Sequence, residues 1–148
     1  MFFATHFYFS SYHVLSNTML RKIKTTYECG FKRRILYITT VLVLSYVTAF
    51  METLTISSFP YYSFEDRDMA YSIGSAFYGI YFIVSFPAFL EFDEDIDKSS
   101  DGGSGSNCRK VTIWDTFLES CGYGMIILCL LDFVRLFTGI PLVVGEMK

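Results

Sequence analysis

The stretch Ile35–Phe59, ILYITTVLVLSYVTAFMETLTISSF, decides the fold, because it is long and apolar enough to cross a bilayer. A membrane-spanning helix needs about 20 consecutive, mostly apolar residues. Glu52 lies inside this stretch. An ionisable side chain is expensive at membrane depth, so it usually faces the interior of a helix bundle and has a function there. Glu52 is therefore the first residue to consider as part of a functional site.

Three further stretches repeat this pattern, and they are Phe2–Leu20, Met69–Leu90 and Thr116–Phe137. The 148 residues are 52% hydrophobic, and the apolar residues come in long blocks. Helices of a soluble domain would instead each carry one polar face. We therefore predict an all-α, polytopic transmembrane helix bundle, with about four spanning helices in a single domain over residues 1–148. The helices are expected at about 2–20, 35–59, 69–90 and 116–137.

The basic residues are distributed as signals of membrane orientation and not as a nucleic-acid-binding patch. They crowd the first loop, as Arg21, Lys22, Lys24, Lys32, Arg33 and Arg34, whereas the second loop carries only Arg67. Cytoplasmic loops carry the excess of Lys and Arg, so the first and third loops are expected in the cytoplasm. The lipid bilayer is the predicted partner, and no nucleic acid is expected.

The third loop, residues 91–115, is acidic at first and then rich in Gly and Ser. Such a composition cannot bury enough apolar surface to fold, so it predicts a flexible cytoplasmic loop. No pair of cysteines has the spacing of a disulfide or of metal ligands, and no metal is expected. Met1 leads directly into an apolar stretch, as if the chain began part-way through a larger protein.

Polar residues of separate helices fall at comparable depths. Counted from the cytoplasmic ends, His6, Glu52 and Asp132 share one layer, and Tyr78 lies a little deeper. The spacing of polar residues also places them on single helix faces. The stripes are His6, Ser10, His13 and Asn17; Ser45, Thr48, Glu52 and Thr55; and Tyr71, Gly74, Tyr78, Tyr81 and Ser85.

Structural roles compete with functional ones at most of these positions. Tyrosines at helical spacing are typical of packing and of the interfacial aromatic belt. Asp132 and Arg135 are one turn apart and can neutralise each other, and His13 can be a hydrogen-bonded helix contact. Glu52 has no basic neighbour within a turn, so its protonated form is favoured at membrane depth, and a neutral carboxylic acid is a proton donor.

A buried acid, histidines and aromatic rings in a water-poor cavity suit acid-catalysed chemistry on an apolar substrate. Ring faces can stabilise a cationic intermediate, and exclusion of water prevents its capture. The candidate catalytic residues are Glu52, His6, His13 and Asp132. The candidate substrate-binding residues are Tyr61, Tyr62, Tyr78, Tyr81 and Asn17.

Several longer motifs carry a resemblance to a known family. They are Ser45-Tyr46 through Glu52-Thr53, Phe59-Pro60-Tyr61-Tyr62, Asp66-Arg67, Phe77 through Pro87, Thr5-His6, Tyr12-His13-Val14, Leu131-Asp132 and Arg135-Leu136-Phe137. In these motifs the chain resembles the cycloeucalenol cycloisomerases, or cyclopropylsterol isomerases. The resemblance implies a multi-pass endoplasmic-reticulum enzyme of sterol synthesis. Such an enzyme opens the 9β,19-cyclopropane ring of cycloeucalenol to give the Δ8 sterol obtusifoliol, without a redox cofactor.

The family has further transmembrane segments before the position that matches Phe2, so we expect missing N-terminal helices or another chain to complete the bundle. Two other functions stay open from the sequence. One is a non-catalytic sterol-binding or scaffold module. The other is an isomerase that moves a sterol double bond.

Overall fold

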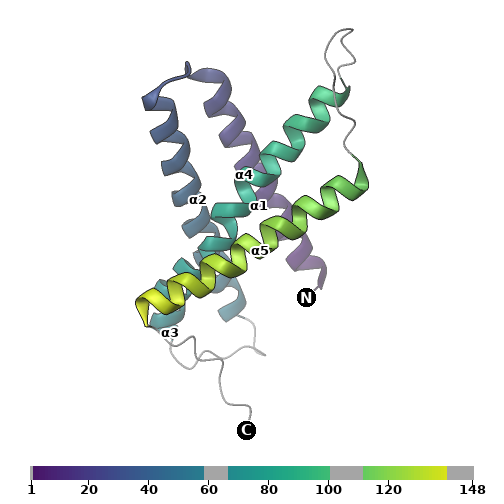
Figure 1. Ribbon diagram of the computed structural model, residues 1–148. Coiled ribbons are helices and arrows are strands. Elements are labelled where there is room, and N and C mark those ends of the chain that lie inside the picture. Colours follow the sequence, from purple (N-terminus) through teal and green to yellow (C-terminus); the bar gives the residue numbers. More distant parts are fainter. Residues whose placement is uncertain (1, 59–66, 101–111, 140–148) are drawn as a thin grey trace.

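The structure is a computed structural model that describes residues 2–58, 67–100 and 112–139 (Figure 1). It contains four long helices: α1 (Phe2–Thr26), α2 (Phe31–Ser57), α4 (Ser75–Ser100) and α5 (Ile113–Thr138). A short helix, α3 (Arg67–Met69), and one π-helical turn, η1 (Ala70–Gly74), lead into α4. No strand occurs in these described ranges. The all-α helix bundle predicted from the sequence is confirmed.

Within the described part of the chain, three segments are long and apolar enough to cross a membrane: Phe31–Ser57, Arg67–Ile96 and Ile113–Thr138. These segments indicate a membrane protein. The helix α1, which was expected to be the fourth span, is not among them. Its apolar residues are interrupted by His13, Ser16 and Asn17, and its last turns are basic. It packs instead beside α2 and α4.

The prediction of a loop over residues 91–115 is wrong at its start, because α4 continues to Ser100. The acidic residues that suggested disorder pair with α1. Asp93 accepts hydrogen bonds from Asn17 and Arg21, and Glu94 accepts one from Lys24. Tertiary ion pairs thus hold a helical turn that composition alone does not favour. Residues 101–111 lie outside the described part of the chain.

The helix α5 begins at Ile113 with a capping box, three residues before its predicted start. The hydroxyl of Thr112 accepts from the backbone N–H of Asp115, and the Asp115 carboxylate accepts from the backbone N–H of Thr112. Both bonds satisfy N–H groups that a helix start otherwise leaves unpaired.

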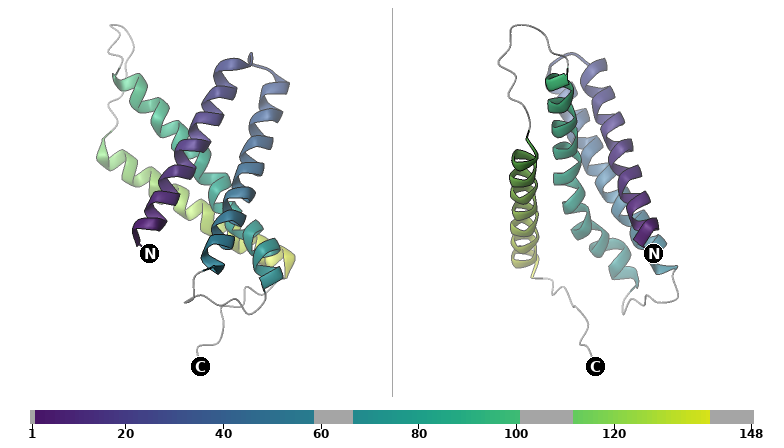
Figure 2. Two further views of the ribbon diagram at one scale, coloured as in Figure 1. Left: turned by 180° about the vertical axis from the view of Figure 1, so that it is seen from behind. Right: turned by 90° about the vertical axis from the view of Figure 1, so that its right-hand side faces the viewer.

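The helices α1, α2 and α4 form a packed unit, and α5 lies on the opposite side of α4 (Figure 2). The unit is centred on buried side chains from all three helices, which are Leu20, Val41, Ala49, Phe82, Phe86 and Leu90. The most extensive contact joins α2 to α4, and small residues lie in it. A methyl group added at Gly79 would lie 3.5 Å from the carbonyl oxygen of Ser45. Small residues at such crossings let membrane helices approach closely.

Candidate functional site

Glu52 and Tyr78 meet across the contact between α2 and α4. The hydroxyl of Tyr78 donates a hydrogen bond of 2.8 Å to Oε2 of Glu52. Tyr81 of α4 stacks on Tyr78, and Tyr12 of α1 contacts the same Phe82 ring as Tyr78 does. Three phenol side chains from two neighbouring helices are thus connected to one carboxyl group through a hydrogen bond and ring contacts. We call Glu52, Tyr12, Tyr78 and Tyr81 the carboxyl–tyrosine cluster.

Aromatic rings pack against this cluster. Tyr78 and Tyr81 are stacked, with ring centroids 6.3 Å apart, and Phe82 makes an edge-on contact with Tyr78 at 5.2 Å. Tyr12 makes a similar contact with Phe82, whose side chain is only 1% exposed. Ring faces carry partial negative charge, so such surroundings favour a nearby cation. The cluster combines a possible proton donor with groups that can stabilise positive charge.

A π-helical turn lies beside the cluster, at the start of α4. The Ser75 hydroxyl donates to the Ala70 carbonyl at 3.3 Å, and it also lies 3.4 Å from the hydroxyl of Thr53, the residue after Glu52. Tyr71 donates to the Ser57 hydroxyl at 2.8 Å. These bonds fix the end of α2 against the start of α4. Sequence reasoning missed this turn, because a π-turn has no pattern of its own, although such turns often occur at functional sites.

His13 lies in a second polar contact, between α1 and α4. Its Nδ1 is 2.9 Å from the carbonyl oxygen of Phe9, which can only accept, so we assign the ring proton to Nδ1. The lone pair of a neutral ring is then on Nε2, which lies 3.2 Å from the Ser85 hydroxyl. The side chain is 4% exposed and is packed against Phe9, Phe86 and Phe89. This geometry gives His13 a proton-accepting nitrogen in apolar surroundings.

A hollow of about 240 Å³ lies between α1, α4 and α5, next to His13. Its wall is largely aromatic and includes Phe9, His13, Tyr81, Ser85, Phe89 and Tyr123. Tyr81 belongs both to this wall and to the carboxyl–tyrosine cluster. Glu52 and His13 lie in different helix contacts. Tyr81 connects them, because it lines the hollow beside His13 and stacks on Tyr78, which binds Glu52.

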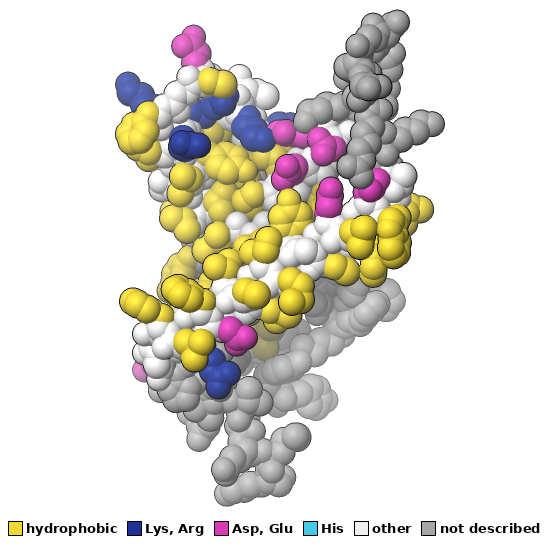
Figure 3. Space-filling model, viewed as in Figure 1, with side chains coloured by type: hydrophobic (Ala, Val, Ile, Leu, Met, Phe, Trp, Pro, Cys, Tyr) yellow, Lys and Arg dark blue, Asp and Glu magenta, His cyan; other side chains and the backbone are white. Residues whose placement is uncertain are grey.

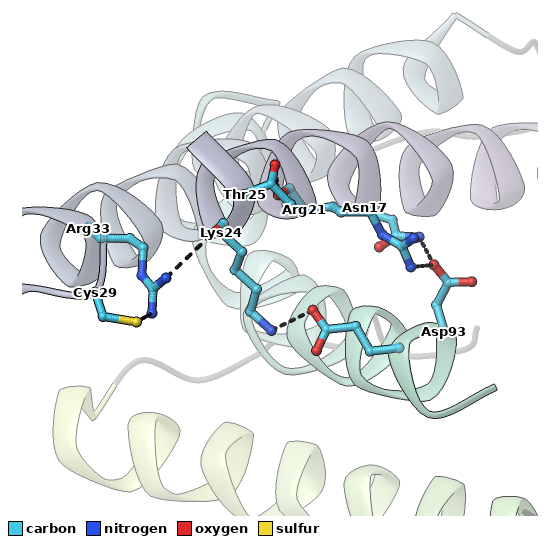
Figure 4. Close-up of polar contacts among 8 residues, drawn as sticks. Asn17, Arg21, Lys24, Thr25, Cys29, Arg33 and Asp93 are labelled. Atoms are coloured by element: carbon cyan, nitrogen blue, oxygen red, sulfur yellow. Dashed lines mark hydrogen bonds and ion pairs between the residues drawn. The ribbon is translucent and has the colours of Figure 1, made fainter. Parts of the chain in front are cut away.

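Asn17 lies elsewhere, at the ion-paired end of α1 (Figure 4). Its Nδ2 donates to Asp93 at 2.7 Å, and Asp93 also pairs with Arg21. Lys24 pairs with Glu94 at 2.8 Å in the next turn. Asn17 is thus part of the contact that holds the end of α4 and is not brought together with Tyr78 and Tyr81.

Asp132 is not brought together with Glu52 either. It is exposed on α5, and among the described elements α5 contacts only α4. His6 lies in α1, but its side chain is outside the described part of the structure, and Tyr61 and Tyr62 lie outside the described residues. Among the residues that were predicted to lie at similar depths in the bilayer, the structure places Glu52 and Tyr78 in contact. Within the described ranges no three His, Cys, Asp or Glu residues are grouped to hold a metal ion.

The chain is 39% identical to the cycloeucalenol cycloisomerase of Arabidopsis thaliana over an alignment of 161 residues. The alignment covers 98% of this chain and 49% of that relative, so the chain spans about half the length of the relative it matches. No protein-family profile matches the chain, and no solved structure matches it. The resemblance seen in the sequence motifs is confirmed as a similarity along nearly the whole chain.

Proposed function

We propose that this chain, a relative of cycloeucalenol cycloisomerase along nearly all of its length, works in the isomerisation of a cyclopropyl sterol. The reaction would open the 9β,19-cyclopropane ring of cycloeucalenol to give obtusifoliol. The observation that carries the proposal is the hydrogen bond between Tyr78 and Glu52, a carboxyl within an apolar spanning segment and among aromatic rings. A sterol is apolar and partitions into the bilayer, where such a segment would meet it.

The proposed reaction adds one proton and removes another, and so needs no oxidant or reductant. A proton is delivered to the ring carbon C19, the C9–C19 bond breaks, and C19 becomes a methyl group. The positive charge left on C9 is a tertiary cation. Loss of the proton on C8 then forms the Δ8 double bond. The rings of Tyr78 and Tyr81 would stabilise the cation.

We assign the acid to Glu52 and the base to His13. The hydrogen bond from Tyr78 occupies Oε2 of Glu52 and leaves Oε1 to carry the acidic proton. The proton-accepting Nε2 of His13 points towards Ser85, beside the aromatic hollow. Tyr81 joins the two contacts and is assigned to substrate binding with Tyr78. His6 and Asp132 are alternative proton carriers, and Tyr61, Tyr62 and Asn17 are further candidates for binding the sterol.

A second function, as a non-catalytic sterol-binding module, is supported by the aromatic hollow between α1, α4 and α5, because Glu52 does not line this hollow. A sterol double-bond isomerase would use the same acid and base on a different substrate. In each case we propose the endoplasmic reticulum membrane as the location, because sterol synthesis takes place there in the related family.

The proposal is tested by expressing the chain in a host that lacks the isomerase and accumulates the cyclopropyl sterol. We expect the Δ8 sterol to appear, and sterol ratios read by mass spectrometry measure the conversion. The same membranes incubated with radiolabelled cyclopropyl sterol report binding. Binding without conversion would support the sterol-binding module. Absence of both, with the protein present in the membrane, would contradict the cycloisomerase and the sterol-binding module alike.

A further inference from the structure

A second hollow, of about 530 Å³, lies at the hairpin between α1 and α2, far from the carboxyl–tyrosine cluster. Its wall consists of basic and aromatic side chains together with one glycine, and these residues are Lys24, Gly30, Phe31, Arg33, Arg34 and Tyr37. No Asp or Glu is among them. The dark blue side chains of Lys and Arg gather on this end of the molecule (Figure 3). We call this the hairpin hollow.

The charge in the hairpin hollow is only partly neutralised. Lys24 pairs with Glu94. Arg33 is held in place by neutral groups, because it donates to the carbonyl oxygen of Lys24 and to the sulfur of Cys29 (Figure 4). It also donates to the carbonyl oxygen of Tyr27. Within the described ranges no carboxylate pairs with Arg33 or Arg34. A fixed guanidinium without a carboxylate partner is well suited to an anionic ligand.

The depth of the hairpin hollow indicates where such a ligand comes from. The apolar stretch of α2 begins at Ile35, directly after Arg34, so the hollow lies at the boundary between the bilayer core and water. Phe31 is 78% exposed, as expected for an aromatic side chain that sits among lipid headgroups. Basic pockets between helix ends at this level bind anionic lipid headgroups. The exposed apolar residues Ile35, Ile38 and Leu42 continue along α2 from this point, where acyl chains can lie.

We propose that the hairpin hollow binds the phosphate headgroup of an anionic phospholipid. Arg34 and Arg33 contact the phosphate oxygens, Phe31 and Tyr37 pack against the glycerol region, and the acyl chains follow α2 into the bilayer. The site is separate from the sterol chemistry and does not depend on it. It would hold the α1–α2 hairpin at the membrane surface and so fix the depth of Glu52 further along α2.

The test uses the full chain purified in detergent and titrated with dioleoyl phosphatidic acid or dioleoyl phosphatidylcholine, with bound lipid counted by native mass spectrometry. We expect phosphatidic acid to bind preferentially. Arg34→Gln should weaken this binding about fivefold, as expected for the loss of one basic residue at a membrane surface. Arg34→Lys, which keeps the charge, should lose less.

Lys32→Gln is the matched control, because it removes the same charge in the same helical turn from a residue that does not line the hollow. Equal weakening by Lys32→Gln and Arg34→Gln would mean general attraction by the basic loop and would overturn the site. Equal binding of the two lipids by the unaltered chain would also overturn it. If inorganic phosphate at millimolar concentration displaces the lipid completely, the ligand is a free anion and the lipid assignment is wrong. Circular dichroism of each variant checks that its helices are intact.

Discussion

The helices α2 and α5 are equally apolar and nearly equal in length, yet they are packed very differently. Both qualify as membrane spans with the same mean hydropathy. Four residues of α2 are buried, namely Val41, Ser45, Thr48 and Ala49, whereas in α5 only Ile127 is. The two helices also differ in the side chains that they present to α4. On α2 these include small and hydroxyl-bearing side chains, which allow close approach to Gly79 of α4. Hydropathy therefore identifies a spanning helix but does not determine how closely that helix is packed.

The comparison predicts that carboxyl groups on the two helices differ in importance for catalysis. Glu52→Gln keeps the shape of the side chain and its hydrogen bond to Tyr78 but removes the acidic proton. Loss of a positioned acid costs about 10²–10⁴ in rate. Asp132→Asn on α5 is the matched control and should change the rate by no more than about twofold, as for an exposed substitution. The assay is the rate of Δ8 sterol formation in membranes at equal protein level.

A large loss with Asp132→Asn and a normal rate with Glu52→Gln would reverse this assignment. It would move the acid to α5 and make Glu52 a packing residue. Tyr78→Phe tests whether the hydrogen bond from Tyr78 only orients the Glu52 carboxyl group. In that case the loss of rate should be smaller than the loss caused by Glu52→Gln.

A smaller effect is expected on stability. Gly79→Leu places a large side chain where an added methyl would already lie 3.5 Å from the backbone of Ser45, and should destabilise the α2–α4 contact by about 1–3 kcal/mol. Gly122→Leu on α5 meets nothing within 4 Å and should change stability by no more than about 0.5 kcal/mol. Titration with sodium dodecyl sulfate, followed by circular dichroism, measures both variants. Equal destabilisation would show that α5 is packed as closely as α2.

The parts that the sequence predicted are those with a periodic or compositional signal. Long apolar blocks marked the helices α2, α4 and α5, and counting residues from the helix ends put Glu52 and Tyr78 at depths where they could meet. The helical turn at Asp93 and Glu94 had no such signal, because it depends on pairing with Arg21 and Lys24 of another helix. Ser85 was placed on a polar stripe, but its contact with His13, which is distant along the chain, had no signal in the sequence. The separation of Asp132 from Glu52 depends on the side of α4 on which α5 packs, which depth along a helix does not determine.

The central claim is that separate groups deliver and remove the proton during opening of the cyclopropane ring. It is tested most directly by running the reaction in D₂O with membranes that contain the chain, and by locating deuterium in the product. If Glu52 is recharged from solvent and His13 accepts the departing proton, one deuterium should appear in the new C19 methyl group at every turnover. A Δ8 sterol without deuterium at C19 would mean that the hydrogen is passed on within the substrate or by one recycled group. That result would contradict the account.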